Sequence, residues 1–210
     1  MARSARTQVL PRGEIDAQQV AVAAEVLAAA FRDDPIFTGT LRDPVRRVAA
    51  LPLLWRALAQ HCAGEGWIDL AERDGQPAGA ALWVDGLRAD IGWTQVARLG
   101  LVRMGLAAGL RDALRLMSVQ ERIGQVHHQL MSAPHLYLLG LGVLPGRQGE
   151  GVGSELLDRG LATADRLQLP AYLETNLEQN ARLYRRKGFQ VVQQDTMHGF
   201  HTWFMVRPTS

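Results

Sequence analysis

The sequence predicts an α/β fold in which helices cover both faces of a central mixed sheet. Three observations support this prediction. Runs with helical periodicity alternate with short β-like runs, an unbroken apolar strand at 136–143 leads through a glycine-rich loop into a helix, and 47% of the 210 residues are hydrophobic. A chain of this length can bury one sizeable core. We therefore expect a single domain over residues 1–210.

The first quarter of the chain is expected to hold two helices. Apolar residues recur every three or four positions over 16–31, and the segment 33–35, Asp-Asp-Pro, ends this run. A second helix should begin after Asp43, which can cap it, with Pro44 in its first turn.

A hairpin and a helical insertion should follow. The β-like runs 67–72 and 78–84 flank an Asp-Gly pair at 74–75, which favours a tight turn between antiparallel strands. The segment 87–131 is then helical, and it could either cover the core or form a wall of a substrate pocket. Its apolar positions are Leu99, Val102, Leu106, Leu110, Leu114 and Met117.

The second half reads as a strand, loop, helix and strand unit followed by a helix and two closing strands. The strand 136–143 is apolar throughout, so both of its faces should be buried at the centre of the sheet. The remaining elements are expected at 154–167 (helix), 171–175 (strand), 180–187 (helix ended by Gly188), 189–193 and 202–206 (strands).

Composition excludes several function classes. The 23 Lys and Arg residues nearly balance the 21 Asp and Glu residues, so the net charge of +2 does not indicate a nucleic-acid or membrane binder. Cys62 is the only cysteine, which rules out an intrachain disulfide. The basic N-terminus lacks the apolar core of a signal peptide, and we expect a cytoplasmic protein.

The glycine-rich loop 148–154, Gln-Gly-Glu-Gly-Val-Gly-Ser, is suited to holding a pyrophosphate. Its glycines let successive N–H groups converge on an anion at the start of a helix. A nucleoside-triphosphate loop is excluded, because Val152-Gly153 stands where Lys-Ser/Thr is required. A dinucleotide fingerprint is supported by Glu174, but the segment 144–147 separates the strand from the glycines and too little chain follows for a second half-sheet.

The loop, together with a second motif, resembles the GNAT superfamily of N-acetyltransferases. Gln148-x-x-Gly151-x-Gly153 after Val143-x-Pro145 is similar to that family's coenzyme A loop, and 180–189 is similar to its second signature. The segments 27–31, 173–175 and 202–205 resemble the puromycin N-acetyltransferase branch. The resemblance implies one GNAT-type domain whose sheet is splayed near Leu141, with a cofactor-binding core at 135–195.

The resemblance also implies acetyl-CoA as co-substrate and assigns its contacts. Asn180 would touch the coenzyme, a role compatible with capping a helix. Tyr184, four residues on, would face the sulfur of the coenzyme as the general acid, or could instead be a half-buried core residue. A backbone N–H near Leu141 would meet the carbonyl oxygen. The expected coenzyme contacts are Leu141, Gly142, Val143, Gln148, Gly149, Glu150, Gly151, Val152, Gly153, Ser154, Asn180 and Tyr184.

The acceptor side of the reaction is less determined. Glu174, at the end of a strand, is the candidate base, with a structural or capping role as the alternative. Asp33 and Asp34 could hold a cationic amine or could simply form a turn. Trp83 and Trp93 could line an acceptor pocket or pack in the core.

The acceptor itself is expected to be a small-molecule primary amine, and the protein a monomer or homodimer. We expect no metal, because neither of the two histidine pairs, His127-His128 and His198-x-x-His201, has a third ligand at recognisable spacing. An acyl-CoA-binding module without turnover is the alternative function.

Overall fold

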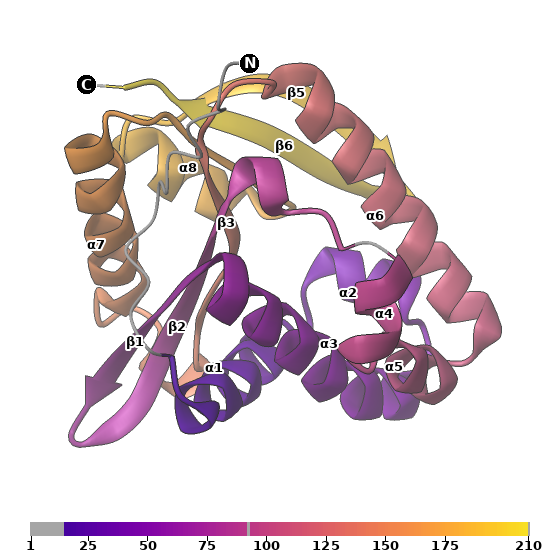
Figure 1. The fold of residues 1–210 in the computed structure, drawn as a ribbon. Coiled ribbons are helices and arrows are strands. Elements are labelled where there is room, and N and C mark those ends of the chain that lie inside the picture. The colour runs from indigo at the N-terminus through magenta and orange to yellow at the C-terminus, as the bar shows by residue number, and fades with distance from the viewer. Residues whose placement is uncertain (1–14, 92, 210) are drawn as a thin grey trace, which may run out of the picture.

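A six-stranded mixed sheet forms the centre of the computed structural model, which describes residues 15–91 and 93–209 (Figure 1). The strand order is β1-β2-β3-β4-β6-β5, and only the β3–β4 pair is parallel. The strands are β1 (Gly66–Arg73), β2 (Gln76–Asp85), β3 (Leu136–Val143), β4 (Ala171–Thr175), β5 (Gln190–Met197) and β6 (Phe200–Arg207). The predicted mixed sheet and hairpin are therefore confirmed.

Helices cover both faces of the sheet, as the sequence predicts. On one face, α1 (Ala17–Ala30), α3 (Pro44–Glu65) and α6 (Leu110–Leu130) pack on the larger core cluster; on the other, α7 (Val152–Leu167) and α8 (Glu178–Arg186) pack on the second (Figure 1). The predicted cap at Asp43 is used, and α1 has a cap at Asp16 as well. The side chain of Asp16 accepts from the backbone N–H of Gln19 at 2.7 Å, and that of Asp43 accepts from the N–H of Val45 at 2.9 Å.

The segment expected to be a simple turn after the first helix begins another short helix, α2 (Pro35–Thr40). The Asp34 carboxylate caps it by accepting a hydrogen bond from the N–H of Ile36 at 3.0 Å, and Pro35 occupies its first position. The sequence located the end of α1 correctly, but the cap and proline also start a new helix.

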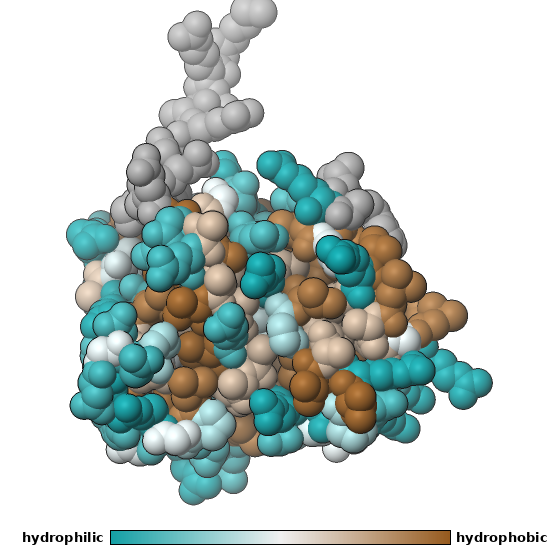
Figure 2. All heavy atoms as spheres, turned by 90° about the horizontal axis from the view of Figure 1, so that it is seen from below, coloured by the Kyte–Doolittle hydropathy of each residue, from teal (hydrophilic) through white to brown (hydrophobic). Residues whose placement is uncertain are grey.

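The insertion 87–131 is helical, as expected, and contains α4 (Trp93–Arg98), α5 (Leu101–Ala108) and α6. Its buried face is not the predicted one: Leu106 is 79% and Leu110 75% exposed. Figure 2 shows brown hydrophobic surface on the right, where α5 and the start of α6 lie. The buried residues of α6 form the neighbouring stripe, Ala113, Leu116, Val119, Ile123, Val126 and His127.

The sheet opens between β3 and β4, as the resemblance implies. These strands pair only at Leu136↔Ala171 and Tyr137↔Tyr172, whereas β3 continues to pair with β2 up to Val143. From Leu138 to Val143 the edge of β3 that faces β4 therefore has no partner strand.

Close packing of helices holds this free segment of β3. The pairs Leu82↔Gly140 and Trp83↔Leu138 leave Leu139 without a partner in β2, which marks a bulge. A Cβ at Gly140 would lie 2.7 Å from the ring of Trp55, and one at Gly142 would lie 2.8 Å from Cβ of Ala30. Glycine at these two positions lets α3 and α1 lie directly against the strand.

Within the described ranges 15–91 and 93–209, none of the helices has the length and apolar character that a membrane span requires.

Candidate active site

The glycine-rich loop forms an open cradle of backbone amides at the start of α7. Gly149 and Gly151 adopt φ values of +87° and +80°, a conformation that favours glycine. Nothing lies within 4 Å of the Cβ that either residue would carry if it were alanine. Among the described residues, no backbone or side-chain acceptor binds the N–H groups of 148–154.

The helix begins at Val152, two residues before the predicted start at Ser154, so the last three residues of the loop form its first turn. The first N–H groups of a helix point at its N-terminus, where the helix dipole favours an anion. The geometry therefore fits the diphosphate of coenzyme A. The amide donors come from the loop backbone and need no lysine.

The free segment of β3 leads directly to this cradle. Its side chains alternate, with Leu141 and Val143 packed toward α7 and Gly142 against α1. The backbone polar groups along the opened edge are thus available to an extended ligand. The predicted coenzyme contacts at 141–143 and 148–154 thus follow each other along the end of β3 and the start of α7, although Gly142 and Val152 are buried.

Helix α8 brings Tyr184 toward this region. Leu177 is the N-cap of α8, so the prediction that Asn180 could cap the helix is wrong. Asn180 and Tyr184 lie one turn apart on the same face. The Tyr184 side chain is 6% exposed and its ring makes an edge contact with Phe189 at 5.8 Å. It is thus part of the second core cluster as well as a candidate site residue.

Three predicted site residues from different elements come together electrostatically. Burial raises the pKa of Tyr184, and the charges of Asp34 and Glu174 raise it further. Burial also raises the pKa of Asp34 to about 6, although the hydrogen bond from the Ile36 N–H lowers it. These charge effects indicate that Asp34 at the N-cap of α2, Glu174 near the end of β4 and Tyr184 of α8 lie near one another.

Glu174 has the environment expected of a base that works near neutral pH. Burial raises its pKa to about 7, while the hydroxyls of Tyr137 and Tyr172 oppose this rise. The Tyr137 hydroxyl donates a hydrogen bond to Glu174 Oε1. Glu174 Oε2 and the Tyr172 hydroxyl are buried and have no hydrogen-bond partner among the described residues.

Two predicted substrate contacts are not part of this cluster. Asp33 is exposed and does not appear among the groups that perturb Tyr184. Trp83 is fully buried on the α7 side, stacked on Trp67 at 5.7 Å and in contact with Gly160. The prediction that Trp83 lines the acceptor site is therefore wrong, and its core alternative is right. The side chain of Trp93 lies outside the described part of the chain.

The sequence reasoning missed Tyr137 and Asn176. Asn176 follows β4, and its amide donates to the Thr202 hydroxyl at 2.8 Å and to the His201 carbonyl at 3.1 Å, which ties β4 to β6 beside Glu174. Tyr137 is the single polar side chain in the apolar run 136–143. A phenol on a strand buried on both faces needs a partner, and that signal could have drawn attention to it.

The histidines do not form a metal site in the described residues. His127 of α6 stacks on His128 and forms a hydrogen bond with His135, with 2.7 Å between the Nε2 atoms of His127 and His135. Because His135 Nδ1 donates to the Ala133 carbonyl at 2.8 Å, His135 Nε2 accepts and His127 Nε2 donates. Over the same residues, no group of three or more His, Cys, Asp or Glu side chains could hold a metal ion.

Comparison with known proteins connects this geometry to a family. Residues 31–189 match the model of the acetyltransferase (GNAT) family, which spans most of the chain and includes the loop, β3, β4 and α8. The chain belongs to this family. It is therefore an acyltransferase of the N-acetyltransferase type, and the α/β fold with its opened sheet is the GNAT fold.

Solved structures have the same fold along nearly the whole chain. A histone acetyltransferase HPA2 and related acetyltransferase from Corynebacterium glutamicum has a TM-score of 0.67 and 25% identity, over 94% of this chain and 95% of that one. An agmatine N-acetyltransferase mutant in its apo form has a TM-score of 0.63 and 18% identity, over 92% and 96%. A polyamine N-acetyltransferase from Drosophila melanogaster has a TM-score of 0.59 and 16% identity, over 92% of this chain and 96% of that one.

Proposed function

We propose that this GNAT protein transfers an acetyl group from acetyl-CoA to the primary amine of a small molecule by direct attack. The observation that carries the proposal is the alignment of three features: the amide cradle at 148–154, the free edge of β3, and the acidic cluster of Tyr184, Glu174 and Asp34. A linear thioester carrier laid along this edge would place its diphosphate at one end and its reactive end toward the cluster.

The bound thioester would supply the acetyl group, and the chain's own residues would handle charge and protons. A primary amine is cationic in solution, and the carboxylates of Asp34 and Glu174 favour a cation in a buried site. Glu174 would then accept the proton that the amine must lose, since a base with a pKa of about 7 is matched to neutral pH.

Tyr184 would act as the general acid for the sulfur of the coenzyme. Because its pKa is raised, the phenol keeps its proton through the physiological range and can donate to the departing thiolate. The bound ammonium first loses one proton to Glu174, which passes it to solvent. As the N–C bond forms and the C–S bond breaks, the nitrogen loses a second proton to Glu174 and the thiolate receives a proton from Tyr184. Solvent then restores both residues to their starting states.

Replacing Tyr184 by Phe tests this assignment. The hydroxyl is removed from a ring that still packs on Phe189, so the fold and coenzyme binding should persist while kcat falls about 10² to 10⁴-fold. Thiol release should be measured with a panel of nucleoside antibiotics, aminoglycosides, polyamines and arylalkylamines, and coenzyme binding by calorimetry.

Two outcomes would contradict the proposal. Wild-type protein that binds acetyl-CoA but releases no thiol with any amine would instead be an acyl-CoA-binding module. A Tyr184→Phe variant with full kcat would show that Tyr184 is not the general acid.

We also propose that the chain belongs to the puromycin N-acetyltransferase branch, which segments 27–31 and 202–205 resemble. We propose further that residues 135–195 form the cofactor-binding core and that the protein is cytoplasmic and a monomer or homodimer.

A further inference from the structure

Glu174 does not stand alone at the end of β4: one of its two oxygens is already engaged. Tyr137 on β3 donates to Oε1, and Oε2 is buried without a partner among the described residues. The two residues come from strands that pair only at their first positions, Tyr137 opposite Tyr172. The bond therefore crosses the sheet where it begins to open.

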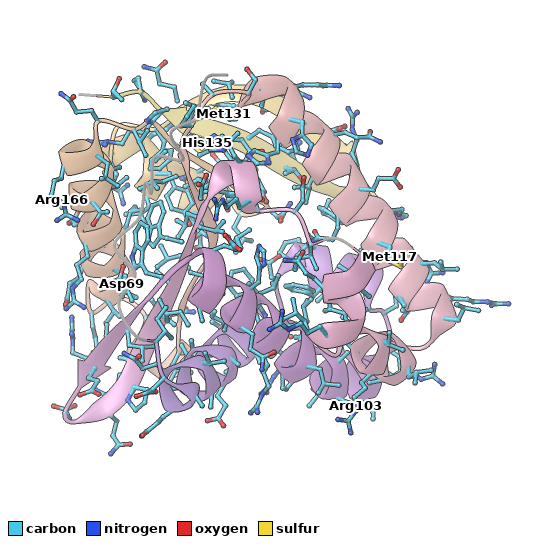
Figure 3. The ribbon with its side chains drawn as sticks, in the orientation of Figure 1. Asp69, Arg103, Met117, Met131, His135 and Arg166 are labelled. Carbon is cyan, nitrogen blue, oxygen red and sulfur yellow. The ribbon has the colours of Figure 1, made fainter. Side chains whose placement is uncertain are left out.

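The Tyr137 ring is held firmly in this place. Its centroid lies 5.0 Å from that of the Tyr172 ring and 4.8 Å from that of the His127 ring, and the residue is 6% exposed. His127 is in turn fixed by its hydrogen bond to His135. Figure 3 labels His135, which directly precedes β3. A hydroxyl on such a packed ring has little freedom to leave its acceptor.

We infer that Tyr137 is a positioning residue for the proposed base: it occupies Oε1 of Glu174, fixes the carboxylate and leaves Oε2 as the proton acceptor. This inference rests on the proposed function of Glu174. A donated hydrogen bond stabilises the charged carboxylate, so it keeps Glu174 able to accept a proton despite its burial. The amine proton moves to Oε2 and the Tyr137 hydroxyl keeps its own proton.

Other ionisable groups around the pair are accounted for. Those that act on Tyr137, Tyr172, Tyr184 or Glu174, or contact their rings, are Asp34 (α2), Asp90, His127 (α6), His135 and the tyrosines themselves. Burial lowers the pKa of His127 to about 4, so it is neutral where the enzyme would work. The Tyr137 hydroxyl donates to Glu174 Oε1, and the Tyr172 hydroxyl also lowers the pKa of Glu174.

The test replaces Tyr137 by Phe and uses Tyr172→Phe as the matched control. Both changes remove one buried hydroxyl that lowers the pKa of Glu174, but Tyr137 donates directly to Oε1, whereas the Tyr172 hydroxyl has no partner within hydrogen-bond distance among the described residues. In Tyr137→Phe the acid limb of the kcat/KM pH profile should move up by about 1 pH unit, with activity about tenfold lower below the limb and nearly unchanged at pH 9. The Kd of coenzyme A should not change, and Tyr172→Phe should shift the limb less.

A merely structural role for Tyr137 would lower activity equally at every pH, and that result would overturn the inference. So would an equal or larger shift in Tyr172→Phe. A second measurement needs no turnover: the ¹³C titration of the Glu174 carboxyl carbon, assigned by its loss in Glu174→Gln, should move to higher pH in Tyr137→Phe.

The titration separates the two proposals. If the wild type releases no thiol with any amine but the carboxyl titration moves as expected, the proposed function fails and the hydrogen bond stands. If Glu174→Gln removes the activity of a functional wild type and Tyr137→Phe leaves both the acid limb and the carboxyl titration in place, only the positioning role fails.

Discussion

Replacing Glu174 by Gln should stabilise the fold at alkaline pH while it removes activity. Burial raises the pKa of Glu174 from 4.5 to about 7, so the folded state binds its proton more tightly than the unfolded chain does. The stabilisation that this proton provides is complete below pH 4.5 and is lost as the pH rises through 7. The difference between these two pKa values, at about 1.4 kcal/mol per pH unit, amounts to about 3 kcal/mol.

Glutamine keeps the Oε1 acceptor for Tyr137 but carries no charge at any pH. The free energy of unfolding, from urea denaturation followed by circular dichroism, should therefore exceed that of the wild type by about 3 kcal/mol at pH 8 and by less than about 1 kcal/mol at pH 5. A gain that is the same at both pH values, or a loss at pH 8, would refute the reasoning.

Asp195→Asn is the matched control for this experiment. The hydrogen bond from Arg122 lowers the pKa of Asp195, so its carboxylate adds stability above its unfolded pKa and loses it as the pH falls. The control should lose stability at pH 8, where Glu174→Gln gains it. The opposite signs would show that the gain comes from the buried site and not from the removal of negative charge in general.

Two further predictions concern glycines. Gly160→Ala would place a Cβ 2.2 Å from the Trp83 ring and should lower the free energy of unfolding by about 2 kcal/mol. Gly124→Ala is the control: its Cβ meets nothing within 4 Å, so it should raise the free energy of unfolding by up to about 1 kcal/mol. Equal effects of the two changes on Tm would contradict this packing. Gly151→Ala must hold φ at +80°, which costs about 1 kcal/mol, and should weaken coenzyme A binding several-fold by calorimetry. Gly146, just before the loop, has open space around the position of a Cβ, so Gly146→Ala should leave binding unchanged. An unaltered Kd in Gly151→Ala would show that the cradle does not need this conformation.

Much of the fold followed from short-range signals. The helix cap at Asp43, the Asp-Gly turn at 74–75 and the apolar strand 136–143 depend on chemistry within a few residues, and all of them form as predicted. The glycine-rich loop is local in the same sense, because a left-handed backbone at 149 and 151 depends mainly on the absence of a Cβ. For such features the sequence was sufficient.

The candidate site needed the tertiary structure. Periodicity shows which residues share a helix face but not which face a neighbour covers, so Leu106 and Leu110 were expected inside and lie outside. Trp83 is likewise buried because Gly160 of α7 lies directly on its ring.

The chain by itself determined the amide cradle, the family motifs and the presence of Tyr184 and Glu174. Only the folded sheet decided that Tyr137 reaches Glu174 and that Asp34 joins Tyr184, because these pairs are brought together by strand opening and helix packing between segments 37 and 150 residues apart. Their shifted pKa values have the same origin, since burial is a property of the assembled core and not of any one segment.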